Sequence, residues 1–189
     1  MLRPAYPIET ARLRLRPFTA DDFDALHAIQ SRPDVARYLY WGPRSREEVR
    51  EALAGRARYT AIEAEGDSLL LAIERRDSGA MIGDVNLQWL SAAHKGGEIG
   101  FVLHPDQHGR GYGREAALEM LRLGFEGLSL HRIIGRCDAR NDASARLMER
   151  LGMRREAHFR ENEWVKGEWC DEYVYALLAA EWASLNAAS

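Results

Sequence analysis

The chain has little cysteine, no long apolar run and no strong excess of charge of either sign. Its two cysteines, Cys137 and Cys170, form no CxxC pair, which argues against a disulfide framework and predicts reduced, buried thiols. No window approaches the roughly 18 apolar residues of a membrane span, and residues 1–16 lack the apolar segment of a signal peptide. The formal net charge of −3 gives no reason to expect nucleic-acid or membrane binding. We therefore expect a cytoplasmic protein that binds neither.

Several other signals are absent. The chain has no N-x-S/T glycosylation acceptor, no Gly-Lys-Ser/Thr P-loop, no low-complexity linker and no internal repeat. Its length of 189 residues suits one domain, and 46% hydrophobic residues suffice for a sizeable core. We expect a single domain over residues 1–189.

The hydrophobic pattern is that of an α/β protein. It predicts helices from Thr19 or Asp21 to Ser31, and over Ser45–Arg58, Gly113–Glu126 and Asp142–Leu151. Strands are predicted over Arg12–Phe18, Tyr59–Ala64, Ser68–Arg75, Met81–Trp89, Glu98–His104, Arg132–Asp138, Met153–Arg160 and Trp169–Leu178. The last two are expected to be joined by a loop over Asn162–Glu168. A run of strands followed by crossover units indicates a mixed sheet flanked by helices.

A glycine-rich segment lies between the strand that ends at His104 and the helix over Gly113–Glu126. It reads His108-Gly109-Arg110-Gly111-Tyr112-Gly113-Arg114 and is called the glycine loop below. Glycines allow positive φ and a close approach of backbone N–H groups to a ligand. The helix that follows adds its unpaired N–H groups and the positive end of its dipole. This combination predicts a site for a phosphate or pyrophosphate.

A dinucleotide site is one interpretation of this loop. Gly111–Ala116 matches G-x-G-x-x-A, and Asp138 stands where a ribose-binding acid is found in that motif. However, residues 105–110 separate the preceding strand from the first glycine of that match, and the rest of the chain lacks the repeating βαβαβ half. The pattern therefore disfavours a nicotinamide cofactor.

The whole chain, over roughly residues 8–182, resembles the GCN5-related N-acetyltransferases, within them the ribosomal-protein N-terminal acetyltransferase-like branch. The resemblance is carried by Gly109–Ala116, by Thr10–Arg16, Gly79–Gly83, Glu98–Phe101, Asn141–Met153 and Asp171–Tyr173. It implies a mostly antiparallel sheet of six to seven strands with about four helices. The sheet would be splayed between the fourth strand, Glu98–His104, and the fifth, Arg132–Asp138.

The resemblance implies acetyl-CoA as the cofactor. Its pyrophosphate would bind the backbone amides of Gly109, Arg110, Gly111, Gly113 and Arg114. The family's usual Gln or Arg at the first position of this motif is His108 here, which shifts the expected binding toward these amides. The pantetheine arm would lie along Phe101, Val102 and Leu103, with Asn141 and Ser144 on its other side.

The implied chemistry is direct transfer of an acetyl group to a primary amine. A peptide α-amine, with a pKa near 7.7–8.0, needs only a mild base. Glu98 is the first candidate for this base, and Ser144, beside Asn141, for the acid that protonates the thiolate. Structural roles remain open for all three: Asn141 as a helix cap, Ser144 in a hydrogen bond to backbone, and Glu98 in a pair with an arginine.

The acceptor is not encoded in a recognisable pattern. In the family, Tyr40 and Trp41 would lie in a loop that walls the acceptor cleft, together with the loop near Asn162–Glu168, and Glu98 would contact the acceptor as well. Core packing and a dimer contact stay open as alternative roles for these aromatic residues. The acceptor is expected to be a protein N-terminal α-amine, with a polyamine, amino acid or antibiotic as the alternative. A non-catalytic acyl-CoA-binding module and a homodimer also stay open. We expect no metal, because His104 and His108 straddle a proline and a loop.

Overall fold

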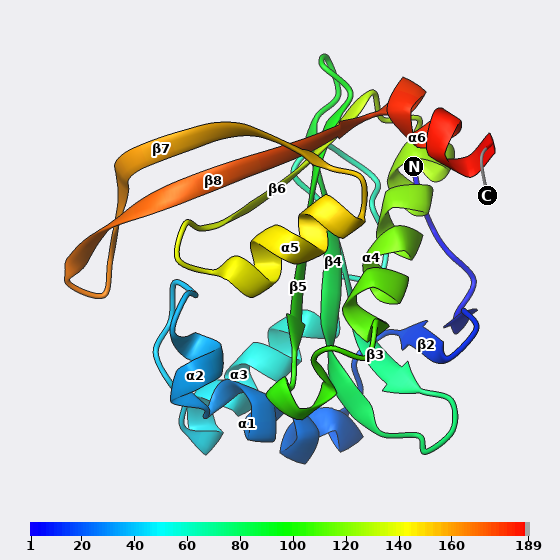
Figure 1. Cartoon of the computed structure of the whole chain (residues 1–189). Coiled ribbons are helices and arrows are strands. Elements are labelled where there is room, and N and C mark those ends of the chain that lie inside the picture. Colours follow the sequence, from blue (N-terminus) through cyan, green and yellow to red (C-terminus); the bar gives the residue numbers. More distant parts are fainter. Residues whose placement is uncertain (188–189) are drawn as a thin grey trace.

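The structure, a computed structural model, describes residues 1–187 and is built on one eight-stranded sheet. The strand order is β1-β2-β3-β4-β5-β6-β8-β7 (Figure 1). The strands are β1 (Ile8–Glu9), β2 (Leu13–Arg16), β3 (Ser68–Arg75), β4 (Met81–Ser91), β5 (Gly96–Leu103), β6 (Arg132–Asp138), β7 (Arg154–Val165) and β8 (Glu168–Leu178). All neighbouring pairs are antiparallel except β5 and β6. The expected mixed, mostly antiparallel α/β fold is confirmed.

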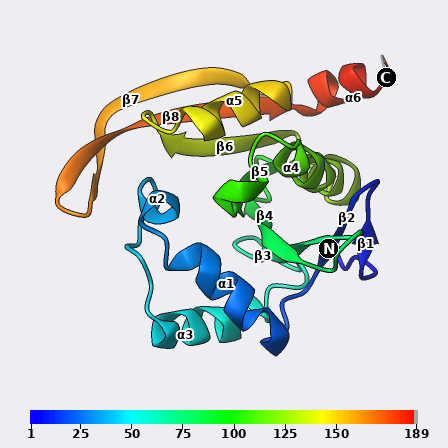
Figure 2. The ribbon, with the colours of Figure 1, turned by 60° about the horizontal axis from the view of Figure 1, so that its bottom comes forward.

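Helices cover both faces of the sheet (Figure 2). They are α1 (Phe23–Gln30), α2 (Pro33–Ala36), α3 (Arg46–Arg56), α4 (Tyr112–Arg122), α5 (Asp142–Arg150) and α6 (Ala179–Ala187). The larger core lies under α4 and α5 and includes Met120, Leu121 and Met148. A smaller core, with Leu26 and Val49, lies under α1 and α3. No helix in the described residues is long and apolar enough to cross a membrane.

The predicted helices form at the predicted places. The capping box of α3 is present, since the Ser45 side chain accepts from the Glu48 amide and Glu48 accepts from the Ser45 amide. The helix predicted to run to Glu126 changes to a π-helical turn over Leu123–Gly127. The structure also adds α2, with Pro33 in its first turn, and α6, beyond the four helices expected.

The strand predicted over Tyr59–Ala64 is wrong. Only Ile62 pairs there, in an isolated bridge with Leu2. The segment forms no ladder with β3: the Leu70 amide donates to the Tyr59 carbonyl at 2.8 Å, but Ile62 pairs with Leu2, and β2 takes the adjoining edge of β3 over Ala72–Arg75. The eighth strand of the sheet is instead the short β1, which extends the edge next to β2.

The loop predicted over Asn162–Glu168 is also wrong. Strand β7 continues to Val165, beyond a register shift between Phe159 and Glu163, and the chain reverses within two residues. Lys166 and Gly167 have φ of 50° and 90°, the left-handed conformations that match the twist of a tight hairpin. The result is a long β7–β8 hairpin that extends beyond α5 (Figure 1).

The splay between β5 and β6 is confirmed. The two strands pair only where Gly96–Glu98 faces Arg132–Ile134, and the ladder stops there. Beyond this point β5 stays paired with β4 through Leu103, and β6 stays paired with β8 through Asp138. The separation opens a gap in the middle of the sheet.

Candidate active site

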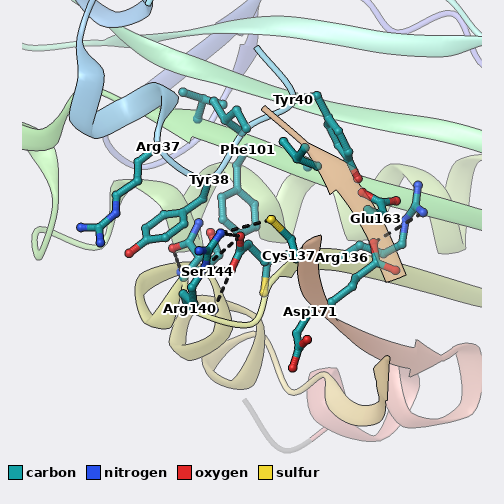
Figure 3. A pocket seen from close by; sticks show the side chains of 18 of the residues that line it. Arg37, Tyr38, Tyr40, Phe101, Arg136, Cys137, Arg140, Ser144, Glu163 and Asp171 are labelled. Carbon is teal, nitrogen blue, oxygen red and sulfur yellow. Dashed lines mark hydrogen bonds and ion pairs between the residues drawn. The ribbon is translucent and has the colours of Figure 1, made fainter. Parts of the chain in front are cut away.

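A cavity of about 270 Å³ occupies the gap between β5 and β6. Its walls come from β5, β6, the start of α5, the β7–β8 hairpin and the segment after α2 (Figure 3). Phe101 and Val102 contribute from β5, and Asn141 and Ser144 from the start of α5. The splay thus brings together residues that the sequence places 39 to 43 positions apart.

One edge of β5 is left free along this cavity. The amide of His104 donates to the carbonyl of Ile82 on β4, at 2.8 Å. Because hydrogen-bonding direction alternates along a strand, the backbone of Val102 also faces β4, while Ile99, Phe101 and Leu103 face the gap. Val102 therefore reaches the cavity only through its side chain. Ile99, which the sequence analysis did not select, has its backbone on the open side.

Gly109 and Gly111 in the glycine loop have φ of +73° and +81°, and Gly111 is the N-cap of α4. Within residues 1–187, no hydrogen bond outside the helices takes the N–H groups of Gly109, Arg110 or Gly111. Unpaired amides at the start of an eleven-residue helix suit an anion.

Gly113 has a different reason to be glycine. It lies inside α4 without a positive φ, and a Cβ there would be 3.1 Å from Leu147 and 3.2 Å from Leu103. Its small size allows α4 to approach β5 and α5 closely. Arg114, one residue further on, donates from Nε to the carbonyl of Arg150 at 3.0 Å.

His108 turns back toward β5. Its Nε2 lies 3.2 Å from the carbonyl oxygen of Leu103, so the ring engages one of the backbone groups on the open edge. This contact links the start of the glycine loop to the end of β5. Since the ladder that ends at Glu98 and Ile134 engages the Ile99 amide, Phe101 is the gap-facing residue of β5 that can offer both backbone groups to a ligand.

Asn141 and Ser144 meet at the first turn of α5. Asn141 is the N-cap, and its Oδ1 accepts from the Ser144 amide at 3.1 Å. Both residues line the cavity. Asn141 therefore has the capping role that the sequence left open, and its position on the cavity wall is compatible with ligand binding as well.

Glu98 lies at the inner end of the splay in an ionic network. Arg136 donates from Nε to Glu98 at 3.1 Å, and its Nη1 lies 3.7 Å from Glu172. Glu172 is only 6% exposed and lines the cavity from β8. Burial raises the pKa of Glu172, the nearby Arg136 opposes this shift, and Glu163 and Glu98 add to it. A buried carboxyl group with a raised pKa is suited to accept a proton near neutral pH.

Tyr40 reaches the cavity and Trp41 does not. The Tyr40 hydroxyl points toward Glu163 of β7 (Figure 3), and desolvation of the hydroxyl followed by the contact with Glu163 raises the pKa of Tyr40, although the residue as a whole is exposed. Trp41 instead lies under the guanidinium of Arg44, 4.5 Å from it. Of the two aromatic residues, Tyr40 lines the cavity and Trp41 is not among its lining residues.

The two cysteines are free and border the cavity. Cys170 is buried and Cys137 half-buried, and burial raises the pKa of Cys137 to about 12. A thiol with this pKa is protonated at neutral pH and is a poor nucleophile. An acyl-enzyme on Cys137 is therefore disfavoured.

Sequence reasoning missed Glu172, Glu163, Arg136 and Lys166 in the cavity wall. Glu172 had a detectable signal, because it shares the inward face of β8 with Cys170 and Ala176, both buried. An acid on such a face indicates a functional or paired carboxylate. The others depend on the long hairpin and the splay, which no local pattern gives.

Comparison with known proteins assigns the family. The model of the Acetyltransferase (GNAT) domain matches residues 12–154. The chain belongs to the GNAT acetyltransferase family. It is an N-acetyltransferase by this membership, and its similarity extends well beyond the matched segment.

Three known proteins illustrate the similarity. The uncharacterized N-acetyltransferase YnaD of Bacillus subtilis is 35% identical over 93% of this chain and 98% of its own length. A GNAT-family acetyltransferase from Bacillus anthracis superposes with a TM-score of 0.82 at 32% identity, over 96% of this chain and all of that one. The spermidine N-acetyltransferase of Vibrio cholerae, solved with CoA and spermine, has a TM-score of 0.75 over 92% and 99% of the two chains. At 22% identity the last shows the shared fold alone.

Proposed function

We propose that this N-acetyltransferase takes acetyl-CoA as its donor. The observation that supports this most is the free backbone: unpaired N–H groups at Gly109–Gly111 lie at the start of α4, and Phe101 faces the open gap. A pyrophosphate suits the first set, and an extended amide-bearing chain suits the second. Acetyl-CoA carries both, and it supplies an acetyl group activated as a thioester.

We propose a primary amine as acceptor, first of all a peptide α-amine. The neutral amine attacks the thioester carbonyl, a C–N bond forms, the C–S bond breaks, and the amine loses a proton. Glu172 accepts this proton directly or through water, Glu98 holds Arg136 in place, and Ser144 protonates the departing thiolate. A carboxylate with a raised pKa matches an amine that is already partly neutral at pH 7.

A single-turnover assay of thiol release tests the proposal, with acetyl-CoA and a panel of short peptides, spermidine, amino acids and aminoglycosides. Release with peptides whose α-amine is free, and none with the same peptides blocked at that amine, is the expected result. Transfer to spermidine alone would show that the acceptor is a polyamine and not a peptide. Binding of CoA without transfer to any amine would favour an acyl-CoA-binding module, and binding of NAD instead would contradict the donor.

A further inference from the structure

The N-terminal segment Thr10–Arg12 contacts the glycine loop through a dense set of bonds. Arg12 donates from Nη1 to the carbonyl of Arg110 at 2.9 Å, and its guanidinium lies 4.7 Å from the centre of the Tyr112 ring. A Cβ at Gly111 would lie 3.3 Å from its Nη2. One side chain thus touches three consecutive residues of the loop.

Glu115, in α4 directly after the loop, completes this arrangement. Its Oε1 accepts from the Thr10 hydroxyl at 2.6 Å and from the Arg12 amide at 2.7 Å, while Oε2 accepts from Arg12 Nε at 2.7 Å. Burial alone would raise the pKa of Glu115, but these hydrogen bonds outweigh it and lower the pKa. The carboxylate is therefore ionised at neutral pH and directed at the N-terminal segment.

An anionic side chain so close to an anion site needs an explanation. A carboxylate in the first turn of α4 repels a pyrophosphate unless its charge is compensated and turned aside. Arg12 does both, since it neutralises Glu115 and holds it against β2. A second arginine, Arg76, donates from Nη1 to the carbonyl of Thr10 at 2.7 Å, which secures the segment from behind.

The bond to the Arg110 carbonyl also fixes the direction of an amide. The peptide between Arg110 and Gly111 is trans, so its carbonyl and its N–H point to opposite sides. Because Arg12 draws the carbonyl toward β2, the Gly111 N–H is directed away from the N-terminal segment. Without this contact, a loop with two left-handed glycines has many alternative conformations.

We infer that Arg12 and Glu115 are positioning residues that pre-organise the glycine loop for a pyrophosphate. The inference rests on the proposed donor and adds to it. Residues of this kind act by reducing the conformational entropy lost on binding, and they do not need to touch the ligand. Their effect is therefore specific to ligands that carry a pyrophosphate.

The test compares CoA with S-acetylpantetheine, which lacks the pyrophosphate, by calorimetric titration of the full chain. Arg12→Met is expected to raise the Kd for CoA at least about tenfold, or about 1.4 kcal/mol, and to leave the Kd for S-acetylpantetheine unchanged. Arg12→Lys keeps the charge but cannot bridge Glu115 and the Arg110 carbonyl, so it should behave like Arg12→Met. Glu115→Gln tests the other residue of the pair. It should raise the Kd for CoA and leave the Kd for S-acetylpantetheine unchanged.

Arg14→Met is the matched control, because Arg14 lies two residues beyond Arg12, in β2, and pairs with Glu9 at 3.1 Å and Glu74 at 3.5 Å. It should bind both ligands like the wild type. Equal losses for both ligands in Arg12→Met, or full CoA affinity in Arg12→Lys, would overturn the positioning role while leaving the donor intact. A wild-type chain that binds S-acetylpantetheine but not CoA would contradict the donor and the inference together.

Discussion

Glu172 and Asp138 line the same cavity, but the pKa values of their carboxyl groups shift in opposite directions. Both are acids with little exposure, and they face each other across β8 and β6. Hydrogen bonds from Arg140 lower the pKa of Asp138 against the effect of burial. The guanidinium of Arg136 lies 3.7 Å from Glu172, so the effect of burial outweighs that of Arg136 and the pKa of Glu172 is raised. The position of one guanidinium separates a structural carboxylate from a candidate base.

Replacing Glu172 by Gln tests this assignment. We expect kcat/KM to fall by about 10²–10⁴, the usual contribution of a general base. The wild-type rate should rise with pH through a pKa above the ordinary Glu value of about 4.3, and this dependence should vanish in Glu172→Gln. Steady-state rates between pH 5 and 9 measure both effects.

The comparison variant is Glu98→Gln, which removes the other carboxylate on Arg136. We expect kcat/KM to fall less in Glu98→Gln than in Glu172→Gln, with the pH dependence retained. A larger fall in Glu98→Gln would show that Glu98 is the base.

The stability of the fold gives an independent check. Because the raised pKa means that the folded state disfavours the ionised form, wild-type stability falls as pH rises through that pKa. Glu172→Gln should therefore be the more stable protein at neutral pH.

Asp22 is a residue whose effect belongs to stability alone. Arg16 donates to both of its oxygens, at 2.8 and 2.7 Å, and the carboxylate also accepts from the Thr19 amide. Asp22→Asn breaks a buried pair and should cost about 3–5 kcal/mol in the free energy of unfolding. Asp24→Asn, in an exposed pair with Arg46, should cost less than about 1 kcal/mol. Urea unfolding at pH 7 measures both.

The loss of unfolding free energy in Asp22→Asn depends on pH, and the pKa of Asp22 sets the direction of this dependence. Against the effect of burial, the hydrogen bonds from Arg16 and Thr19 lower the pKa of Asp22 in the folded state. Its contribution is therefore complete above the unfolded value of about 3.9 and is lost as pH falls through the lower folded value. The gap between wild type and Asp22→Asn should narrow below about pH 4. A constant gap down to pH 2 would contradict an ionised Asp22.

Two elements far apart in the sequence close one side of the cavity. Lys166, at the turn of the β7–β8 hairpin, donates from Nζ to the carbonyls of Ala36 at 2.7 Å and Arg37 at 2.9 Å. These carbonyls end the short helix α2, so a cation is favourable there. The contact ties the hairpin to the segment that presents Tyr40.

Lys166→Met should loosen this wall. We expect the KM for the acceptor to rise by about three- to tenfold, since a hydrogen bond to a charged group contributes about 1.5–3 kcal/mol and part is recovered from water. Affinity for CoA should not change. Lys95→Met is the matched control, because Lys95 also adopts a left-handed turn, with φ of 48°, on a hairpin at the other end of β5. Equal acceptor KM values in the two variants would rule out the contact as part of the acceptor site.

The molecule as a whole should be stabilised by its donor. A ligand that binds only the folded chain adds about 2.7 kcal/mol at a hundred times its Kd. For a chain of 189 residues, this corresponds to a rise in Tm of roughly 5–10 °C. Differential scanning fluorimetry with CoA should show this shift. NAD at the same concentration should show none, and the reverse order would contradict the proposed donor.

The sequence by itself determined the local elements and the loop. Leu13 and Leu15 alternate with arginines in β2, Ser45 and Glu48 fix the start of α3, and Gly111 opens α4, because each signal acts within a few residues. Order along the chain gave the mixed sheet and the position of the glycine loop between β5 and α4. These features need only short-range sterics and hydrogen bonds.

Only the tertiary structure decided what surrounds the cavity. The pairing of Lys166 with α2, the exclusion of Trp41 and the burial of Glu172 follow from where β5 and β6 separate and how far the β7–β8 hairpin extends. The strand expected over Tyr59–Ala64 failed for a similar reason, since Ile62 pairs with Leu2 and β2 takes the adjoining edge of β3 over Ala72–Arg75. Such outcomes depend on competition between distant segments for the same partners, and a single sequence does not record which segment wins.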